Sequence, residues 1–133
     1  MSHFITAAHS ILPSRRIITD PMRLYALATD ASFYRLTPKA ALLVDDEDEV
    51  RQLLPVALAH NIGVTFRAAG TSLSGQAVTD SVLIVANSHN NYKWSQHTVL
   101  DNGAAVRCKP GAIGGQVNAT LAPYVPAASR IEN

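Results

Sequence analysis

Hydrophobic positions along the chain form short runs separated by polar and glycine-containing segments. Ala40–Val44 is a continuous apolar run of strand length, and Gly63–Phe66 and Val82–Ala86 predict two more short strands. Between the first two, apolar residues recur at helical spacing from Val50 to Leu58. A strand, a helix and a strand of these lengths predict a parallel pair joined by a right-handed crossover.

The helix in this unit has a marked beginning. The run 45–49 consists of acidic residues, a composition that suits either a cation site or the first turn of a helix. Asp46 followed by Glu49 has the form of a capping box, and acids in the first turn favour the helix dipole. The alternating ligands and the glycine of a calcium loop are missing. We therefore expect a helix here, kinked or split at Pro55.

The N-terminal part of the chain gives weaker signals. Residues 1–18 show no clear period and predict a loosely held arm. Asp20 followed by Pro21 predicts the start of a short helix, with a carboxylate at the N-cap and proline at the first helical position. Met22, Tyr25 and Ala26, together with Thr29, would form one face of this helix.

The pattern changes after residue 87. Trp94–Leu100 and Ala104–Cys108 predict two antiparallel strands, and Asn102-Gly103 between them favours a type I′ turn. Ile113–Leu121 predicts a helix. The expected fold class is therefore α+β, with a small parallel βαβ core followed by the start of an antiparallel subdomain.

This organisation predicts an N-terminal arm over 1–18, a first subdomain over 19–90 and a second part over 91–133. With 133 residues, 47% of them hydrophobic, the chain suits one domain better than two. The net charge of +1 argues against nucleic acid or anionic lipid as the main partner. The single cysteine, Cys108, excludes an internal disulfide and is expected to be buried in its strand.

Neither a metal site nor a membrane span is indicated. The histidines are dispersed and no pair has the spacing of metal ligands. No run approaches the ~20 apolar residues of a membrane span, and Met1–Leu12 lacks the basic residues of a secretory signal. A cytoplasmic location is therefore expected, with attachment to a membrane surface through another part or partner left open.

One loop has the composition of a ligand-binding segment. After the second strand the chain is small, polar and punctuated by glycine for ten residues. Backbone N–H groups can point inward in such a loop, and its hydroxyls add donors, so it suits a pyrophosphate. The candidate binding residues are Arg67, Ala68, Ala69, Gly70, Thr71, Ser72, Leu73, Ser74, Gly75 and Gln76.

Two common phosphate loops are excluded. Gln76-Ala77 stands where a Walker loop needs Lys and Ser or Thr. A Rossmann fingerprint opens a helix, whereas this loop runs into another strand. A plain surface loop that joins two strands remains the alternative.

The loop resembles the pyrophosphate-binding loop of FAD-linked oxidases of the p-cresol methylhydroxylase and vanillyl-alcohol oxidase type. That pattern is Arg, two small residues, Gly, Thr or His, Ser, two further residues and Gly. Thr29–Tyr34 followed by Pro38 resembles a segment of D-lactate dehydrogenases, the glycolate oxidase FAD subunit and 2-hydroxyglutarate dehydrogenases. Val44–Val50 resembles the second strand and acid-capped helix of the family. Lys109-Pro110-Gly111 with Asn118, and the proline-containing stretch 124–129, resemble later family segments.

The resemblance implies an FAD-dependent oxidoreductase acting on a small D-2-hydroxy acid. The 67–76 loop would hold the FAD pyrophosphate, and Pro110 and Gly111 would lie near its adenine or ribitol side. Thr71 stands where some relatives attach flavin through histidine, so FAD would be bound non-covalently. Members of the family are several times longer, so this chain would be an N-terminal part, inactive alone and without catalytic residues.

Two other functions remain open at this stage. One is a free-standing nucleotide-binding module that recognises ADP-like ligands without redox chemistry. The other is an interaction module that keeps only the scaffold. A chain that holds only part of the binding site would expose the apolar surface meant for the missing subdomain, so self-association is expected for an interaction module.

Overall fold

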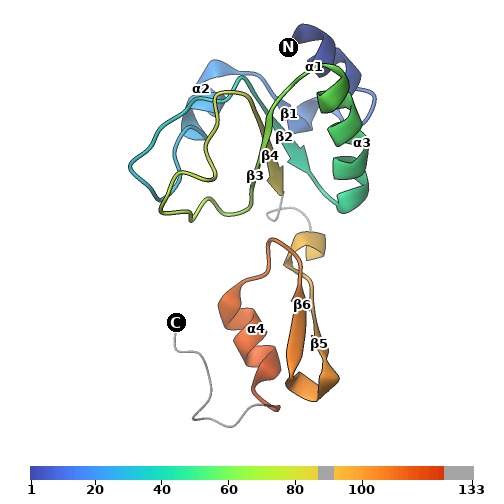
Figure 1. The fold of residues 1–133 in the computed structure, drawn as a ribbon, viewed down its shortest axis with the longest axis vertical. Helices are drawn as coiled ribbons and strands as arrows, with labels where there is room; N and C mark the ends of the chain where they lie inside the picture. Colours follow the sequence, from blue (N-terminus) through green and yellow to red (C-terminus); the bar gives the residue numbers. More distant parts are fainter. Residues whose placement is uncertain (87–91, 125–133) are drawn as a thin grey trace. The chain divides into compact units, whose positions relative to one another are not determined.

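The computed structural model describes residues 1–86 and 92–124. The chain divides into two compact units, Met1–Asn87 and Ser88–Asn133 (Figure 1). The first unit contains a mixed sheet and three α-helices, and the described part of the second contains a hairpin and one helix. The α+β fold class is confirmed.

A four-stranded sheet is the centre of the first unit (Figure 1). Strands β2, β4 and β3 are parallel, β1 is antiparallel to β2, and the order is β1-β2-β4-β3. The predicted strands are present and parallel, but β4 lies between β2 and β3, so those two do not pair with each other. The bounds are Ile17–Ile18 for β1, Ala40–Val44 for β2, Val64–Arg67 for β3 and Val82–Ala86 for β4.

Helix α3, Glu47–Ala59, begins as the acidic run predicts. The Asp46 side chain accepts from the Glu49 N–H at 3.1 Å, and the Glu49 carboxylate accepts from the Asp45 N–H at 2.7 Å. The acidic run is therefore a helix start, as expected. The helix continues through Pro55 as one element, so the expected split is wrong.

The expectation of a loose N-terminal arm is wrong. Residues Ser2–Ala8 form helix α1, and the side chains of Phe4 and Leu12 are 1% exposed. The Phe4 ring meets the His60 ring edge-on, with centroids 6.4 Å apart. Phe4, Ala8 and Leu12 recur every four residues and are all buried, which is a helical period that the polar residues between them obscure.

Helix α2, Pro21–Ala26, is capped as predicted but buries a different face. The Asp20 side chain accepts from the Arg23 N–H at 2.9 Å. Met22 is 81% exposed and Tyr25 57% exposed, while Leu24 is buried, so the predicted face is wrong. Leu24 joins the buried cluster of one sheet face, which consists of Ile18, Leu24, Ala41 and Leu83.

The second unit contains the predicted hairpin, β5 (His97–Leu100) and β6 (Ala105–Cys108), and helix α4 (Gly114–Leu121). Leu100 pairs with Ala105, so four residues form the turn and the expected two-residue type I′ turn is wrong. Asp101 and Asn102 have φ of 49° and 52°, which gives the chain a longer left-handed turn. Short 3₁₀ segments cover Tyr92–Ser95 and Asp101–Gly103.

Cys108 lies in β6 as predicted, but it is exposed, so the expectation of a buried thiol is wrong. The physical reason is that β6 as a whole is little covered: Ala105 and Arg107 are exposed and only Val106 is partly covered. Among residues 1–86 and 92–124, no helix has the length and apolar character needed to cross a bilayer. The stretch 125–129, which includes Pro126 of the family-like segment, lies outside the described residues.

Candidate functional site

The candidate loop connects the carboxyl end of β3 to β4. Gly70 has φ of 72° and Gly75 has φ of 75°, a left-handed conformation that side chains rarely adopt. The glycines therefore stand at the positions where the backbone requires them. In open sheets with parallel strands, ligands bind outside the carboxyl ends of strands, which is where this loop lies.

Several backbone N–H groups of the loop are available to a ligand. In the part of the chain that the structure describes, five of them donate no hydrogen bond. An anion that accepts from several of them at once would satisfy donors that otherwise meet only water. These groups belong to Gly70, Thr71, Ser72, Leu73 and Gly75.

Ser72 supports the loop from within. Its Oγ accepts from the Ser74 N–H at 3.3 Å and from the Gln76 N–H at 3.2 Å, and donates to Gln76 Oε1 at 2.5 Å. Its hydroxyl is therefore engaged, whereas the sequence suggested a donor to phosphate. Thr71 and Ser74 are exposed and could supply that donor instead.

A second segment, residues 27–36, lies against the loop. The Ala31 N–H donates to the Gly70 carbonyl at 3.0 Å, and the Ala77 N–H donates to Asp30 Oδ2 at 3.4 Å. Arg67 Nη1 donates to the carbonyls of Leu27 and Thr29. The sequence missed these contacts because the two segments are about forty residues apart and neither has a regular period.

Asp30 and Ser32 form the turn cap that this pair of residue types favours. Asp30 Oδ1 accepts from the Ser32 N–H at 2.9 Å, and Ser32 Oγ accepts from the Tyr34 N–H at 3.1 Å. Hydrogen bonding from Ser32 lowers the pKa of the Asp30 carboxyl below its ordinary value. Asp30 is therefore held as a carboxylate that links both segments.

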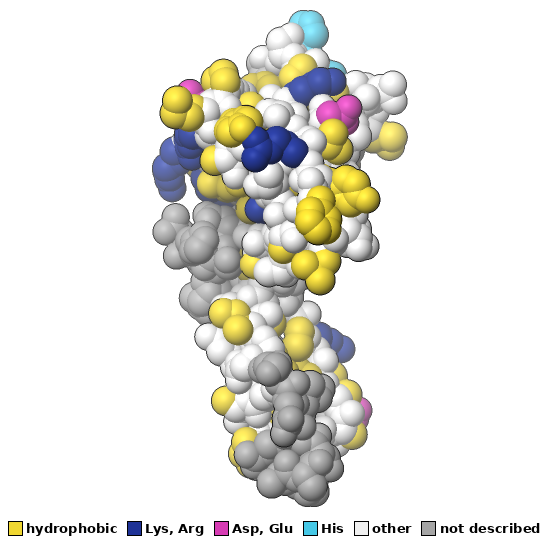
Figure 2. Space-filling view, turned by 90° about the vertical axis from the view of Figure 1, so that its left-hand side faces the viewer, with side chains coloured by type: hydrophobic (Ala, Val, Ile, Leu, Met, Phe, Trp, Pro, Cys, Tyr) yellow, Lys and Arg dark blue, Asp and Glu magenta, His cyan; other side chains and the backbone are white. Residues whose placement is uncertain are grey.

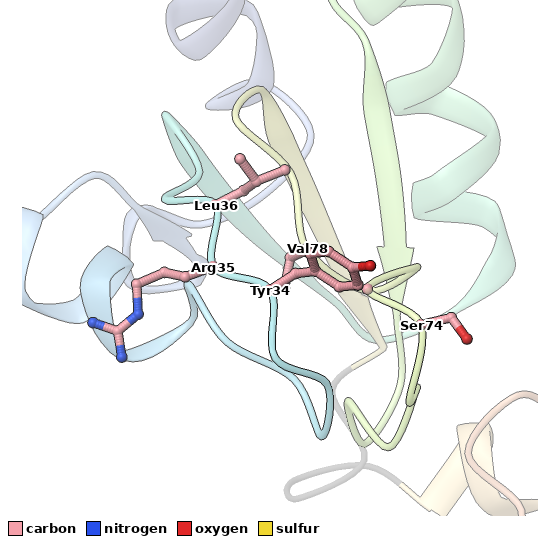
Figure 3. A pocket seen from close by; sticks show the side chains of 6 residues that line it. Tyr34, Arg35, Leu36, Ser74 and Val78 are labelled. Carbon is pink, nitrogen blue, oxygen red and sulfur yellow. The ribbon is translucent and has the colours of Figure 1, made fainter.

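A pocket of about 310 Å³ lies beside the loop (Figure 3). In Figure 3 the side chains of Arg35 and Ser74 extend away from those of Tyr34 and Val78. A Cβ on Gly75 would lie 2.7 Å from Tyr34 Cδ2, so the ring packs directly on this glycine. Tyr34, Arg35, Leu36, Ser74, Gly75 and Val78 line the pocket.

Large hydrophobic side chains of the two segments are exposed. Phe33 is fully exposed and Leu73 is 77% exposed. Figure 2 shows hydrophobic side chains on the face of the first unit where these segments project. Tyr34 and Leu36 are also exposed, at 60% and 46%.

Pro110 and Gly111, the other predicted binding residues, belong to the second unit. They form the turn between β6 and α4. The Gly111 N–H donates to the Trp94 carbonyl at 2.8 Å, and a Cβ at Gly111 would lie 3.0 Å from that oxygen. Gly111 thus packs closely on Trp94.

The described ranges 1–86 and 92–124 contain no group of three or more His, Cys, Asp or Glu residues arranged to hold a metal ion. The acidic residues at the start of α3 contact a basic residue instead. Arg16 Nη1 lies 2.9 Å from Asp45 Oδ2, and Nη2 lies 2.6 Å from Glu49 Oε1.

Comparison with known proteins gives consistent results. The sequence model of the FAD binding domain matches residues 38–126. A D-2-hydroxyglutarate dehydrogenase of Pseudomonas putida is 31% identical over 104 residues, which are 74% of this chain and 10% of that protein. The chain thus spans about a tenth of this relative's length.

Solved structures share the fold. An alkyldihydroxyacetonephosphate synthase matches 92% of this chain and 25% of its own, at 12% identity and a TM-score of 0.71. A p-cresol methylhydroxylase with substrate bound matches 92% of this chain and 24% of its own, at 12% identity and a TM-score of 0.64. At this identity the likeness establishes the fold.

Proposed function

Since this chain belongs to the FAD binding domain family, as its resemblance to the p-cresol methylhydroxylase type indicated, we propose that its 67–76 loop holds the pyrophosphate of FAD. The observation that carries this proposal is the set of backbone N–H groups, those of residues 70–73 and 75, that donate no hydrogen bond in the described chain. A pyrophosphate carries the negative oxygens that such a set accepts. The two left-handed glycines keep the loop in this conformation.

The residues present fit this group. The loop offers N–H donors and the exposed hydroxyls of Thr71 and Ser74 on one short stretch of chain. None of the acidic side chains is within the stretch 67–76, so no carboxylate of the loop itself repels a phosphate. Pro110 and Gly111 of the second unit would contribute beside the adenine or ribitol.

We propose non-covalent attachment of FAD at this loop. Thr71 stands at the position where some relatives carry a histidine bonded to flavin, and a threonine hydroxyl is not a comparable nucleophile. The expected signature is release of free FAD when the loaded protein is denatured. Flavin that stays with the denatured chain would contradict this.

The oxidoreductase that contains this domain would act on a D-2-hydroxy acid. Support comes from the D-2-hydroxyglutarate dehydrogenase, which is 31% identical over 104 residues. When bound, FAD supplies the two-electron acceptor for oxidation of the alcohol carbon. In this chain the loop residues would bind and orient the dinucleotide, and no catalytic residue is assigned to it.

The test is a titration of the isotope-labelled chain with FAD, ADP and adenosine, following backbone N–H signals. We expect FAD and ADP to shift the signals of residues 70–75, and adenosine, which lacks the pyrophosphate, to leave them in place. Absence of any shift with millimolar FAD and ADP would overturn the proposal.

A pair of variants at Thr71 makes this test sharper. Thr71→Asp places a carboxylate beside the proposed phosphate, whereas Thr71→Asn has nearly the same shape without the charge. The side chain is exposed, so both variants should fold. We expect Asp to weaken FAD binding about tenfold more than Asn, a difference that added salt reduces.

A second function, self-association, is favoured by the exposed loop residues Phe33 and Leu73. Exposed apolar groups of this size mark interaction sites when they lie together. Light scattering over a concentration series tests it: Phe33→Ser combined with Leu73→Ser should lower the apparent mass of any dimer. A wild-type chain that stays monomeric at all concentrations would contradict self-association.

A further inference from the structure

Arg67 is the last residue of β3, and its guanidinium is engaged by backbone. Nη1 donates to the Leu27 carbonyl at 3.0 Å and to the Thr29 carbonyl at 2.9 Å. Both hydrogens of this nitrogen therefore point to the 27–36 segment. The side chain is half-buried. The sequence instead placed Arg67 among the residues of the loop that bind the pyrophosphate.

The same guanidinium lies directly against Gly70. A Cβ on Gly70 would be 2.6 Å from Arg67 Nε and 2.7 Å from Cζ. The end of an arginine is normally flexible and could move aside, but here the two carbonyls hold it. Gly70 therefore needs to be glycine for two reasons: its φ of 72° and the guanidinium beside it.

The contacts of Gly70 fix the direction of the next N–H group. The Gly70 carbonyl accepts from the Ala31 N–H at 3.0 Å, so it points toward the 27–36 segment. The Gly70–Thr71 peptide is planar and trans, which makes its N–H point opposite to its carbonyl. The Thr71 N–H consequently faces away from that segment, toward the free side of the loop.

We propose that Arg67 is a positioning residue for the anion site rather than a ligand of the phosphate. Its guanidinium joins the carbonyls of Leu27 and Thr29 to the surface of Gly70. This contact holds the Gly70 carbonyl against Ala31 and the Thr71 N–H toward the dinucleotide. The inference rests on the proposed function, because it assigns a role within that same site.

The first test is made without ligand. Arg67→Met keeps the aliphatic stem and removes every donor, leaving the two carbonyls without this partner. We expect the Ala31 amide to exchange with solvent about tenfold faster or more in the variant, because its bond to Gly70 loses support. Unchanged exchange at Ala31 would overturn the positioning role.

The second test separates positioning from charge. Arg67→Lys keeps the positive charge but loses the planar arrangement of donors. If Arg67 positions the loop, Lys and Met should both weaken FAD binding by about 10- to 100-fold. If Arg67 instead attracts the phosphate by its charge, Lys should bind nearly as tightly as Arg, which would overturn the inference.

Two further readouts show whether the guanidinium touches the ligand. In the wild-type chain, FAD should shift the backbone N–H signals of residues 70–75 and leave the Arg67 Nε–H signal in place. The dependence of FAD affinity on salt should have the same slope in wild type and Arg67→Met. A shifted Nε–H signal or a clearly flatter slope would establish direct contact and overturn the proposal.

Arg51→Met is the matched control. Arg51 is on α3, its side chain is 79% exposed and it pairs with Asp48. The variant removes the same groups from the same unit, so FAD affinity and Ala31 exchange should match wild type. A wild-type chain that binds neither FAD nor ADP would contradict the proposed function. The amide exchange of Ala31 without ligand would still show whether Arg67 holds the loop in its conformation.

Discussion

The two units of this chain differ in how they are held together. In the first, β2 and β4 are buried along most of their length, and side chains of α1, α2 and α3 join the core. In the second, no residue of β5 or β6 is buried, and Trp94 is the single buried hydrophobic side chain among residues 93–124. The faces of these two strands are only partly covered, and an isolated two-stranded hairpin is marginally stable. Among the described residues, the first unit therefore has a much larger apolar core than the second.

The largest expected effect comes from Trp94→Ala. Removing a buried indole costs about 4 kcal/mol, more than a hairpin and one short helix can lose. We expect the N–H signals of residues 92–124 to collapse toward unfolded positions, while those of 1–86 keep their dispersion. Loss of signals in both units would contradict the independence of the first.

The reciprocal change is Leu83→Ala, in β4. Leu83 is fully buried, and its truncation should destabilise the first unit by about 3 kcal/mol in urea unfolding. The signals of β5 and β6 should stay unchanged until the first unit unfolds. Equal loss of stability in both units would show that they unfold as one.

The sequence predicted the central strands and helix α3 of the first unit for a physical reason. Val82–Ala86 and Ala40–Val44 are apolar runs because both sheet faces are covered, and such runs are visible without any partner. The acid-capped start of α3 was equally visible, since Asp46 and Glu49 contact neighbours within one turn. The turn of the hairpin depends on the left-handed backbone conformation of Asp101, which the residue type alone does not predict.

In the candidate site, too, features that depend on neighbouring residues were predictable and long-range contacts were not. The left-handed glycines Gly70 and Gly75 follow from local composition, and the structure has them. The engagement of Arg67 with Leu27 and Thr29 spans 40 and 38 residues and has no local signal. Local patterns thus indicated which loop is the candidate. The contacts that set its shape join residues far apart in the sequence, so only the folded structure shows them.

A smaller effect tests whether the apolar core alone stabilises the first unit. Arg16 bonds Asp45 and Glu49 with a side chain that is 12% exposed. Arg16→Met would leave two partly buried carboxylates without this partner. We expect a loss of about 1–2 kcal/mol in urea unfolding, reduced from the value of a fully buried pair because the carboxylates reach solvent.

The control for this change is again Arg51→Met, which breaks a pair whose side chains are 79% and 75% exposed. It should change the free energy of unfolding by less than about 0.5 kcal/mol. If Arg16→Met proves equally neutral, the polar network contributes nothing measurable and the core alone stabilises the first unit.

The smallest effect concerns the edge of the first unit, where Asp30 joins the 27–36 segment to the candidate loop. Because hydrogen bonding lowers the pKa of Asp30 below 3.8, its stabilising effect is complete above that pH and is lost as the pH falls through the lowered pKa. We expect the amide signals of Ser32 and Ala77, which donate to this carboxylate, to move together with an inflection below pH 3.8. Asp30→Asn should abolish the inflection. An inflection at or above pH 3.8 in the wild type would show that the carboxylate is free in solution and that the link to the loop does not form.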